Sequence, residues 1–289
     1  MDEATARIQF IISVVLYGTL GTVLRFVDLP SEAAVLVRGA GGCLVILAFM
    51  LSRGGKPDAE AIARNLKWLL ASGVALGLNW IFLFAAYAHT TVAIASLCNY
   101  TAPLMVLAVS PVVFGEKLGP KRLACVIGAA AGVVLVSGVF GSSQGTAFDP
   151  VGIALGMTGA VFFAALVIFN KKLEGIGSYD RTVVQLGVAS LTVLPYVLFT
   201  NGGIPLPKGI VSVLLMVVVV LVHTGIAYIF YFGGMGALPV HEVALLGYIE
   251  PVVAVLCSAL VLHEPLGVLG IIGAALVIVS AAAGELVEE

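Results

Sequence analysis

Residues 77–119 read GLNWIFLFAAYAHTTVAIASLCNYTAPLMVLAVSPVVFGEKLG, and residues 225–267, 148 positions later, read GIAYIFYFGGMGALPVHEVALLGYIEPVVAVLCSALVLHEPLG. The two stretches align without a gap. They share thirteen residues, numbered here in the first stretch: Gly77, Ile81, Phe82, Phe84, Val92, Leu97, Tyr100, Pro103, Ser110, Val113, Glu116, Leu118 and Gly119. Apolar residues match by chance in an apolar chain, so the evidence for a common origin of the two stretches comes mainly from the matches of the rarer Tyr, Pro, Glu and Gly. We interpret the match as an internal duplication, with halves at 1–141 and 142–289.

The chain that contains this repeat is more apolar than soluble proteins are. Of its 289 residues, 61% are hydrophobic and 10% are charged, whereas soluble domains are about half apolar and about a quarter charged. A bilayer accommodates such a chain because lipid covers the apolar faces, and it favours helices because they satisfy their own backbone polar groups. The composition therefore predicts an all-α integral membrane protein with the lipid bilayer as a partner.

Ten segments approach the roughly 20 apolar residues that cross about 30 Å of hydrocarbon. We expect the transmembrane helices at residues 8–26, 31–51, 66–88, 92–114, 123–140, 151–170, 182–200, 210–232, 243–262 and 266–286.

The positive charges indicate how these spans are oriented. With a cytoplasmic N-terminus, eleven of the 14 Lys and Arg lie on the inner side, including Arg181; Arg25 and Lys208 lie outside, and Arg38 lies within the second span. The positive-inside rule then places both termini in the cytoplasm. Because each half holds five spans, the second half is inserted upside down. The loop with Glu116 is then internal and the loop with Glu264 external.

Inverted repeats recur in secondary transporters, because two related halves can rock around a midplane site and open it to either side. The duplication therefore favours a carrier that works by alternating access on a small solute. The alternative is that duplication is only a simple way to build a stable bundle.

The repeated pattern is an aromatic-rich helix, a short loop, a helix with a proline, and a loop glutamate. Its motifs are Gly115-Glu116-Lys117-Leu118 in the first half and, in the second, Tyr248-Ile249-Glu250-Pro251 and His263-Glu264-Pro265-Leu266. The pattern resembles the EamA-type branch of the drug/metabolite transporter superfamily. That resemblance implies a ten-helix 5+5 inverted-repeat carrier in the cell (inner) membrane, often an exporter of amino acids or other metabolites. The aromatic third and eighth spans look like the aromatic amino-acid exporters, whereas His263 departs from the usual Gly before the loop Glu.

Two charges inside spans are candidate site residues, because a charge in hydrocarbon costs from about 2.5 to over 10 kcal/mol. Glu250 falls near the middle of the ninth span, where it is a candidate for substrate binding and for proton coupling. The alternative is a structural Glu bonded to a neighbouring hydroxyl or amide. Arg38 either binds a substrate carboxylate or extends its head towards the membrane surface.

Aromatic and amide side chains continue along the faces of the third, fourth, eighth and ninth spans at helical spacing. A cavity lined by such groups suits an amphipathic solute, because rings supply apolar contact and amides or hydroxyls fix polar ends. Tyr17 and Tyr196 we assign instead to the interfacial belt. The further candidate substrate-binding residues are Asn79, Trp80, Leu83, Tyr87, Asn99, Tyr100, Thr224, Tyr228, Tyr231 and Tyr248.

Three other residues have candidate dynamic roles. Pro103 and Pro251 each remove a backbone hydrogen bond within a span and are candidate hinges, although ordinary bending gives the same pattern. His223 either titrates during transport or is a satisfied core histidine.

Several function classes are not expected. A net charge of -2 and the lack of a basic patch argue against nucleic-acid binding. His241 and His263 each precede a Glu, but neither is followed by the second His of a zincin metalloprotease motif. Gly234 and Gly236 do not complete a dinucleotide-binding motif. The cysteines occur singly, which argues against disulfides and zinc ligands. We therefore expect no metal and no cofactor.

The alternatives to an amino-acid exporter are a carrier of a nucleoside or sugar derivative, an intramembrane enzyme, and a passive channel or scaffold. Small-residue faces at residues 128–132 and at Gly270 and Gly273 are expected to hold each half together or to mediate a weak homodimer. The expected state is a monomer or weak homodimer.

Overall fold

The computed structural model describes residues 3–113, 119–136, 149–235, 237–238, 243, 246–264 and 266–286. All regular structure within these ranges is helical, which confirms the all-α prediction there, whereas Glu116 and His241 lie outside them. The helices are α1 (Glu3–Leu24), α2 (Ser31–Ser52), α3 (Ala59–His89), α4 (Val92–Asn99), α5 (Ala102–Val113), α6 (Pro120–Val136), α7 (Pro150–Asn170), α8 (Ser178–Asn201), α9 (Gly209–Val220), the π-helix η1 (Leu221–Ile226), α10 (Ala227–Met235), α12 (Ile249–Leu260) and α13 (Val268–Leu286).

Seven helical segments of the described chain are long and apolar enough to cross a membrane. They are Glu3–Leu24, Ser31–Ser52, Ala59–His89, Val92–Val109, Pro150–Asn170, Ser178–Asn201 and Gly209–Met235. Three shorter apolar helices, Leu123–Leu135, Ile249–Leu260 and Val268–Ala283, fall in the other expected spans. The count of ten spans and the orientation of the termini stay predictions.

Short polar side chains fix several helix starts. Asp58 accepts a hydrogen bond from the Ala61 amide at 2.9 Å, so α3 begins at Ala59 rather than at the expected residue 66. Thr91 caps α4 through the Ile94 amide at 3.1 Å. Asp149 caps α7, and the Gly152 and Val151 amides that it binds lower the pKa of its carboxyl group.

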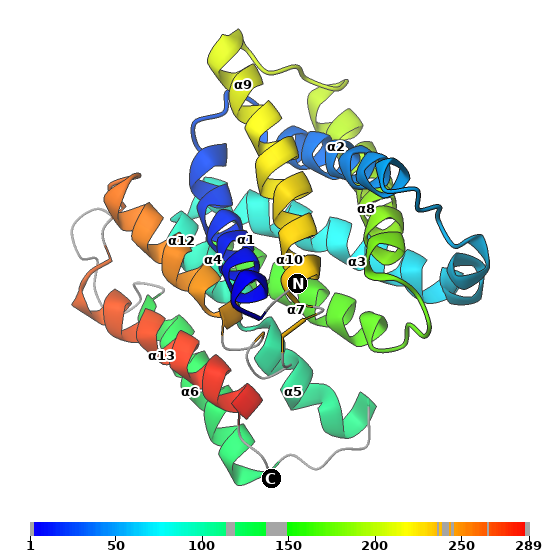
Figure 1. The fold of residues 1–289 in the computed structure, drawn as a ribbon. Helices are drawn as coiled ribbons and strands as arrows, with labels where there is room; N and C mark the ends of the chain where they lie inside the picture. Colours follow the sequence, from blue (N-terminus) through cyan, green and yellow to red (C-terminus); the bar gives the residue numbers. More distant parts are fainter. Residues whose placement is uncertain are drawn as a thin grey trace.

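The helices form one bundle with a paired appendage (Figure 1). α3 packs against α7 and α8, α2 covers α8, and α1 lies against α10 and α12. α6 and α13 lie side by side at one edge, next to α5. Because α6 comes from the first half of the chain and α13 from the second, this pair joins the two halves. The expectation that small-residue faces hold each half together is wrong for Gly128 and Gly132, which face α13.

The helix breaks around the two repeated prolines are related by the internal repeat. The chain leaves the α-helix at Tyr100 and Thr101, before α5, and again at Tyr248, before α12. Pro103 and Pro251 therefore stand in the first turns of α5 and α12, where proline costs little because the first amides of a helix have no partner within it. Each proline thus follows an interruption of the helix within its expected span, and whether these interruptions act as hinges stays a hypothesis.

Gly132 lets α6 and α13 approach closely. A Cβ added there would lie 2.8 Å from the Gly273 carbonyl oxygen and 2.9 Å from the Val277 amide nitrogen, neither of which can yield without moving α13. We expect Gly132→Ala to destabilise the folded protein by about 1–3 kcal/mol, measured as a lower melting temperature in detergent. Gly187→Ala, where the nearest atom is Cys43 Sγ at 3.8 Å, is the matched control. Equal melting temperatures would contradict the close packing.

Candidate functional site

A cavity of about 380 Å³ lies inside the bundle, enclosed by α1, α2, α3, α4, α7, α8, α10 and α12. Neither α6 nor α13 contributes to its described wall. Ten of the residues predicted from the sequence line it: Arg38, Asn79, Trp80, Leu83, Tyr87, Asn99, Tyr100, Tyr228, Tyr231 and Glu250. The tertiary structure thus brings together side chains that are separated by up to 212 positions (250 − 38) in the chain.

Arg38 is held from two sides. Its side chain is buried, its Nε donates to Thr224 Oγ1 at 3.2 Å, and its guanidinium lies 5.0 Å from the centre of the Trp80 ring. Such cation–π contacts contribute about 2 kcal/mol when desolvated. Thr224 does not line the cavity as expected but stands behind Arg38, and its own hydroxyl donates to the Val219 carbonyl at 3.0 Å across the π-helix. The guanidinium therefore stays inside the bundle and does not extend to the membrane surface.

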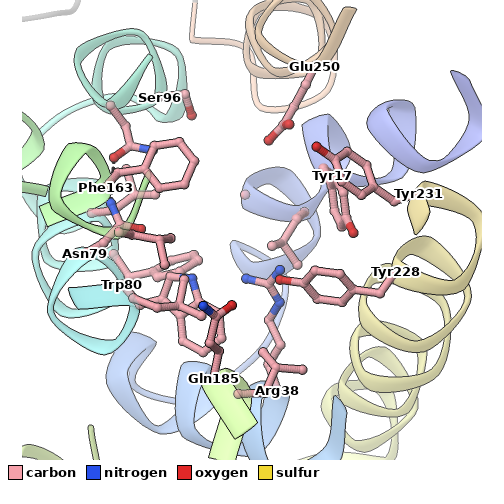
Figure 2. Close-up of a pocket in the computed structure, with 18 of the residues that line it drawn as sticks. Tyr17, Arg38, Asn79, Trp80, Ser96, Phe163, Gln185, Tyr228, Tyr231 and Glu250 are labelled. Atoms are coloured by element: carbon pink, nitrogen blue, oxygen red, sulfur yellow. Dashed lines mark hydrogen bonds between the residues drawn. The ribbon is translucent and has the colours of Figure 1, made fainter. Parts of the chain in front are cut away.

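Glu250 faces Arg38 across the cavity (Figure 2). Its carboxylate comes from the first turn of α12, and the Tyr100 hydroxyl lies against it. Among the described residues, the ion pairs of the chain include neither Arg38 nor Glu250. The Arg38 guanidinium and the Glu250 carboxyl group therefore lie on opposite sides of the same cavity.

Three tyrosines form one wall between these ends. Tyr17 lies 5.5 Å from Tyr228 and 5.9 Å from Tyr231 between ring centres. The assignment of Tyr17 to an interfacial belt is wrong, because the face of α1 that carries this residue packs towards α10 and α12 and lines the cavity. Tyr196 is 37% exposed and does not line the cavity, so its assignment to the belt stays a prediction.

Amides form the opposite wall. Asn79 Nδ2 donates to Asn99 Oδ1 at 2.7 Å and to the Gly159 carbonyl at 2.9 Å. Gln185 Nε2 donates to Ser72 Oγ at 2.7 Å and also to Asn170 Oδ1. These bonds tie α3 to α4, α7 and α8, and they hold the polar side chains in fixed positions before a solute arrives.

Besides Tyr17, eight polar or aromatic lining residues of the described chain were not predicted from the sequence: Phe84, Ser96, Phe163, Asn170, Arg181, Thr182, Gln185 and Phe232. Arg181 was counted as a loop cation because the seventh span was expected to begin at residue 182. The helix α8 begins at Ser178, so its first turn carries Arg181 to the cavity, where the guanidinium lies 5.8 Å from the Phe232 ring centre. Phe84 and Phe232 are an identical pair at the offset of 148 residues, so the repeat could have indicated them. The other five carry no charge or repeat signal that would distinguish them.

Two predicted site residues lie elsewhere. His223 is buried between the π-helix and α1, with Nε2 3.1 Å from Thr19 Oγ1, and it does not line the cavity. Because the Thr19 hydroxyl donates to the Leu16 carbonyl at 2.9 Å, it accepts from the His223 ring. Tyr248 packs against Leu104 and its apolar neighbours beside α6. The arrangement gives His223 a structural contact between helices.

Comparison with known proteins identifies the family to which this chain belongs. The pattern of the EamA-like transporter family matches the chain twice, over residues 5–138 and 150–283. The chain belongs to the EamA-like transporter family. It is thus a multi-pass membrane protein of a transporter family, and the resemblance predicted from the repeat is confirmed.

Individual relatives of this EamA-like chain are distant but cover most of it. An uncharacterized transporter, YxxF of Bacillus subtilis, is 28% identical over 88% of the chain and 81% of its own length. The pseudopaline exporter CntI of Pseudomonas aeruginosa is 26% identical over 64% of the chain and 66% of its own length. A solved crystal structure has the same fold, with a TM-score of 0.66 and 22% identity over 97% of both chains.

Thr224 provides a test of how Arg38 is positioned. Thr224→Val keeps the volume but leaves Arg38 Nε without its acceptor, so we expect a loss of about 1–3 kcal/mol in stability, measured as a lower denaturation midpoint. Thr224→Ser keeps the hydroxyl and should stay near the wild type. If the Val and Ser variants unfold at the same midpoint, the hydroxyl does not hold the guanidinium.

Proposed function

We propose that this protein is a secondary transporter that exports a small zwitterionic metabolite, an amino acid with an aromatic or other hydrophobic side chain, by alternating access. The observation that carries the proposal is the pair Arg38 and Glu250, which face one cavity between aromatic walls and share no ion pair with each other or with other described residues.

The energetics of buried charge support a solute with both signs. Holding an uncompensated charge away from water costs several kcal/mol, and an opposite charge with good hydrogen-bond geometry recovers that cost. A carboxylate would bind the guanidinium of Arg38 through two parallel hydrogen bonds. An ammonium group would bind Glu250 beside the tyrosine rings, which also attract cations. A solute with both groups satisfies both ends of the cavity at once.

The walls between the charges support an apolar remainder. Tyr17, Tyr228 and Tyr231 on one side and Trp80 on the other supply ring faces, and aromatic pairs contribute about 0.5–1.5 kcal/mol beyond the area that they bury. A cavity of about 380 Å³ lies within the usual size of small-molecule sites. These features favour a single amino acid over a larger conjugate.

Direction and architecture are parts of the same proposal. The two separate family matches, over residues 5–138 and 150–283, support two five-helix halves, and the Lys and Arg distribution supports a cytoplasmic location of both termini. The relative named as a pseudopaline exporter supports export, and with it residence in the cell (inner) membrane. Since the cavity is enclosed within one chain, a monomer suffices for transport.

The proposed orientation of the solute gives a crossed prediction. In proteoliposomes, exchange is first screened with amino acids, sugars and nucleosides, and the best amino acid is then compared with its deaminated and decarboxylated analogues. Glu250→Gln should lose about 10- to 100-fold in affinity for the amino acid but not for the deaminated acid. Arg38→Gln should also lose about 10- to 100-fold in affinity for the amino acid, but it should keep its affinity for the decarboxylated analogue, the amine.

Tyr196→Phe, outside the cavity, is the control for that comparison and should leave every affinity unchanged. Equal losses for all analogues in both charge variants would contradict the orientation. Exchange of sugars or nucleosides alone would contradict the substrate class, and the absence of saturable exchange for every solute would refute the carrier.

Glu250 also provides a test of coupling, since it is the carboxyl group that faces the described cavity and can carry a proton across the cycle. We expect Glu250→Gln to abolish uptake driven by a pH gradient while solute exchange at high concentration continues. The measurement compares accumulation with and without an imposed pH gradient at fixed solute. A Gln variant that accumulates solute at the wild-type rate under the gradient rules out coupling through this residue.

A further inference from the structure

Three segments that are distant in the sequence meet at one end of the cavity, beyond Ser96 and Tyr87. They are the end of α1, the turn between α3 and α4, and the loop that follows α12. Glu264 lies at the junction: its Oε1 is 3.2 Å from Arg25 Nη2, and its Oε2 accepts from the Val92 amide at 3.1 Å and from Ser258 Oγ at 2.7 Å. One carboxylate thus binds groups from all three segments.

Arg25 adds a second connection between the same segments, because its Nη2 also donates to the Thr90 carbonyl at 3.1 Å. Val92 is the first residue of α4, so its amide has no partner within the helix and the positive end of the helix dipole points at Glu264. In the α3–α4 turn, the Thr90 carbonyl therefore accepts a hydrogen bond from Arg25, and the Val92 amide donates one to Glu264. We call Arg25, Thr90, Val92, Ser258 and Glu264 the Glu264 tie.

The helix α1 also makes close contacts near this tie, through two glycines in its last two turns. Gly18 and Gly21 are three residues apart and so share a face of α1, and Arg25 follows directly after the last residue of the helix. A Cβ on Gly18 would lie 2.6 Å from the Glu250 carbonyl oxygen, and one on Gly21 would lie 2.8 Å from Val92 Cγ1. The backbone of α1 therefore lies directly against α12 at Gly18, and Gly21 leaves room for the Val92 side chain of α4. Both glycines also line the cavity.

We propose that the Glu264 tie is a gate: it holds α1, α4 and α12 together and closes this end of the cavity, and it separates when the cavity opens there. The inference rests on the proposed function, because a gate is needed only if the cavity opens alternately to the two sides. The charge distribution places this end at the outer surface.

The chemistry of the tie suits a contact that opens and closes. The Arg25 and Glu264 side chains are 35% and 20% exposed, so water can replace each bond that breaks, and partly exposed ion pairs contribute little net stability. The α6–α13 contact, by contrast, depends on backbone atoms and apolar groups in close contact, which separate only at a large cost. The bundle thus has an end that can open without disturbing the pair that joins its halves.

The test measures access to the cavity and does not require transport. A cysteine introduced as Ser96→Cys lies on the cavity wall, one helical turn beyond Val92, and is labelled with a membrane-impermeant maleimide applied to either face of the membrane. The parent without this cysteine corrects for the four native cysteines. Glu264→Gln and Arg25→Gln weaken the tie through different residues. Gly18→Ala displaces α1 from α12 but removes none of the hydrogen bonds or the ion pair of the Glu264 tie.

Glu32→Gln is the matched control. Glu32 is also a carboxylate that joins two helices, since its Oε1 accepts from Asn201 Nδ2 at 3.0 Å, but it links α2 to α8, which pack along each other and need not separate. We expect labelling from one face to rise about three- to tenfold in Glu264→Gln, Arg25→Gln and Gly18→Ala and to stay unchanged in Glu32→Gln.

Unchanged labelling from both faces in the two Gln variants, with melting temperatures near the parent, would overturn the gate. A rise in Glu32→Gln equal to that in Glu264→Gln would also overturn it, because loosening would then be general. Faster labelling in a protein that exchanges no solute would refute the proposed function while leaving the conformational gate established, so the two failures are distinguishable.

Discussion

Arg38 places a guanidinium in the middle of a helical bundle, and much of the surrounding structure follows from the need to hold that charge. An uncompensated cation in such a place costs several kcal/mol. The π-helix turns Thr224 towards the guanidinium, and Trp80 offers its ring face from α3. Both contacts leave the guanidinium on the cavity wall, where the proposed function assigns it the carboxylate of the solute.

The internal repeat explains the shape of the cavity but not its charges. Trp80 and Tyr228 occupy equivalent positions at the offset of 148, as do Leu83 and Tyr231, and all four line the wall. At the same offset, Glu250 corresponds to Ala102 and Arg38 to Leu186. Arg181, which also lines the cavity, corresponds to Ala33. The two stretches thus provide similar aromatic or apolar surfaces, while none of the three described charged lining residues has a charged counterpart at this offset.

The sequence predicted ten of the 27 described residues that line the cavity, because charged and aromatic residues are conspicuous in apolar spans and fall at helical spacing on a few faces. It failed for Tyr17, since a tyrosine on a single span looks the same whether the helix lies at the periphery or at the centre. It also failed for Thr224, whose partner Arg38 is 186 positions away (224 − 38) in the chain. Contacts between distant segments depend on the rotation of each helix about its axis, and a hydrophobic run leaves that rotation undetermined.

Composition was enough to predict a membrane-embedded protein, all-helical over the described residues, and the repeated motifs were enough to predict its family, because the apolar content of a chain and its internal similarity are properties of the residues alone. The sequence also marked Glu264 as a repeated loop residue, without a partner. Only the tertiary structure placed its carboxylate between Arg25, Val92 and Ser258, and only it set Glu250 across a cavity from Arg38. The physical reason is that ion pairs and cavities are made by packing, which brings together groups whose separation along the chain carries no information about their distance in space.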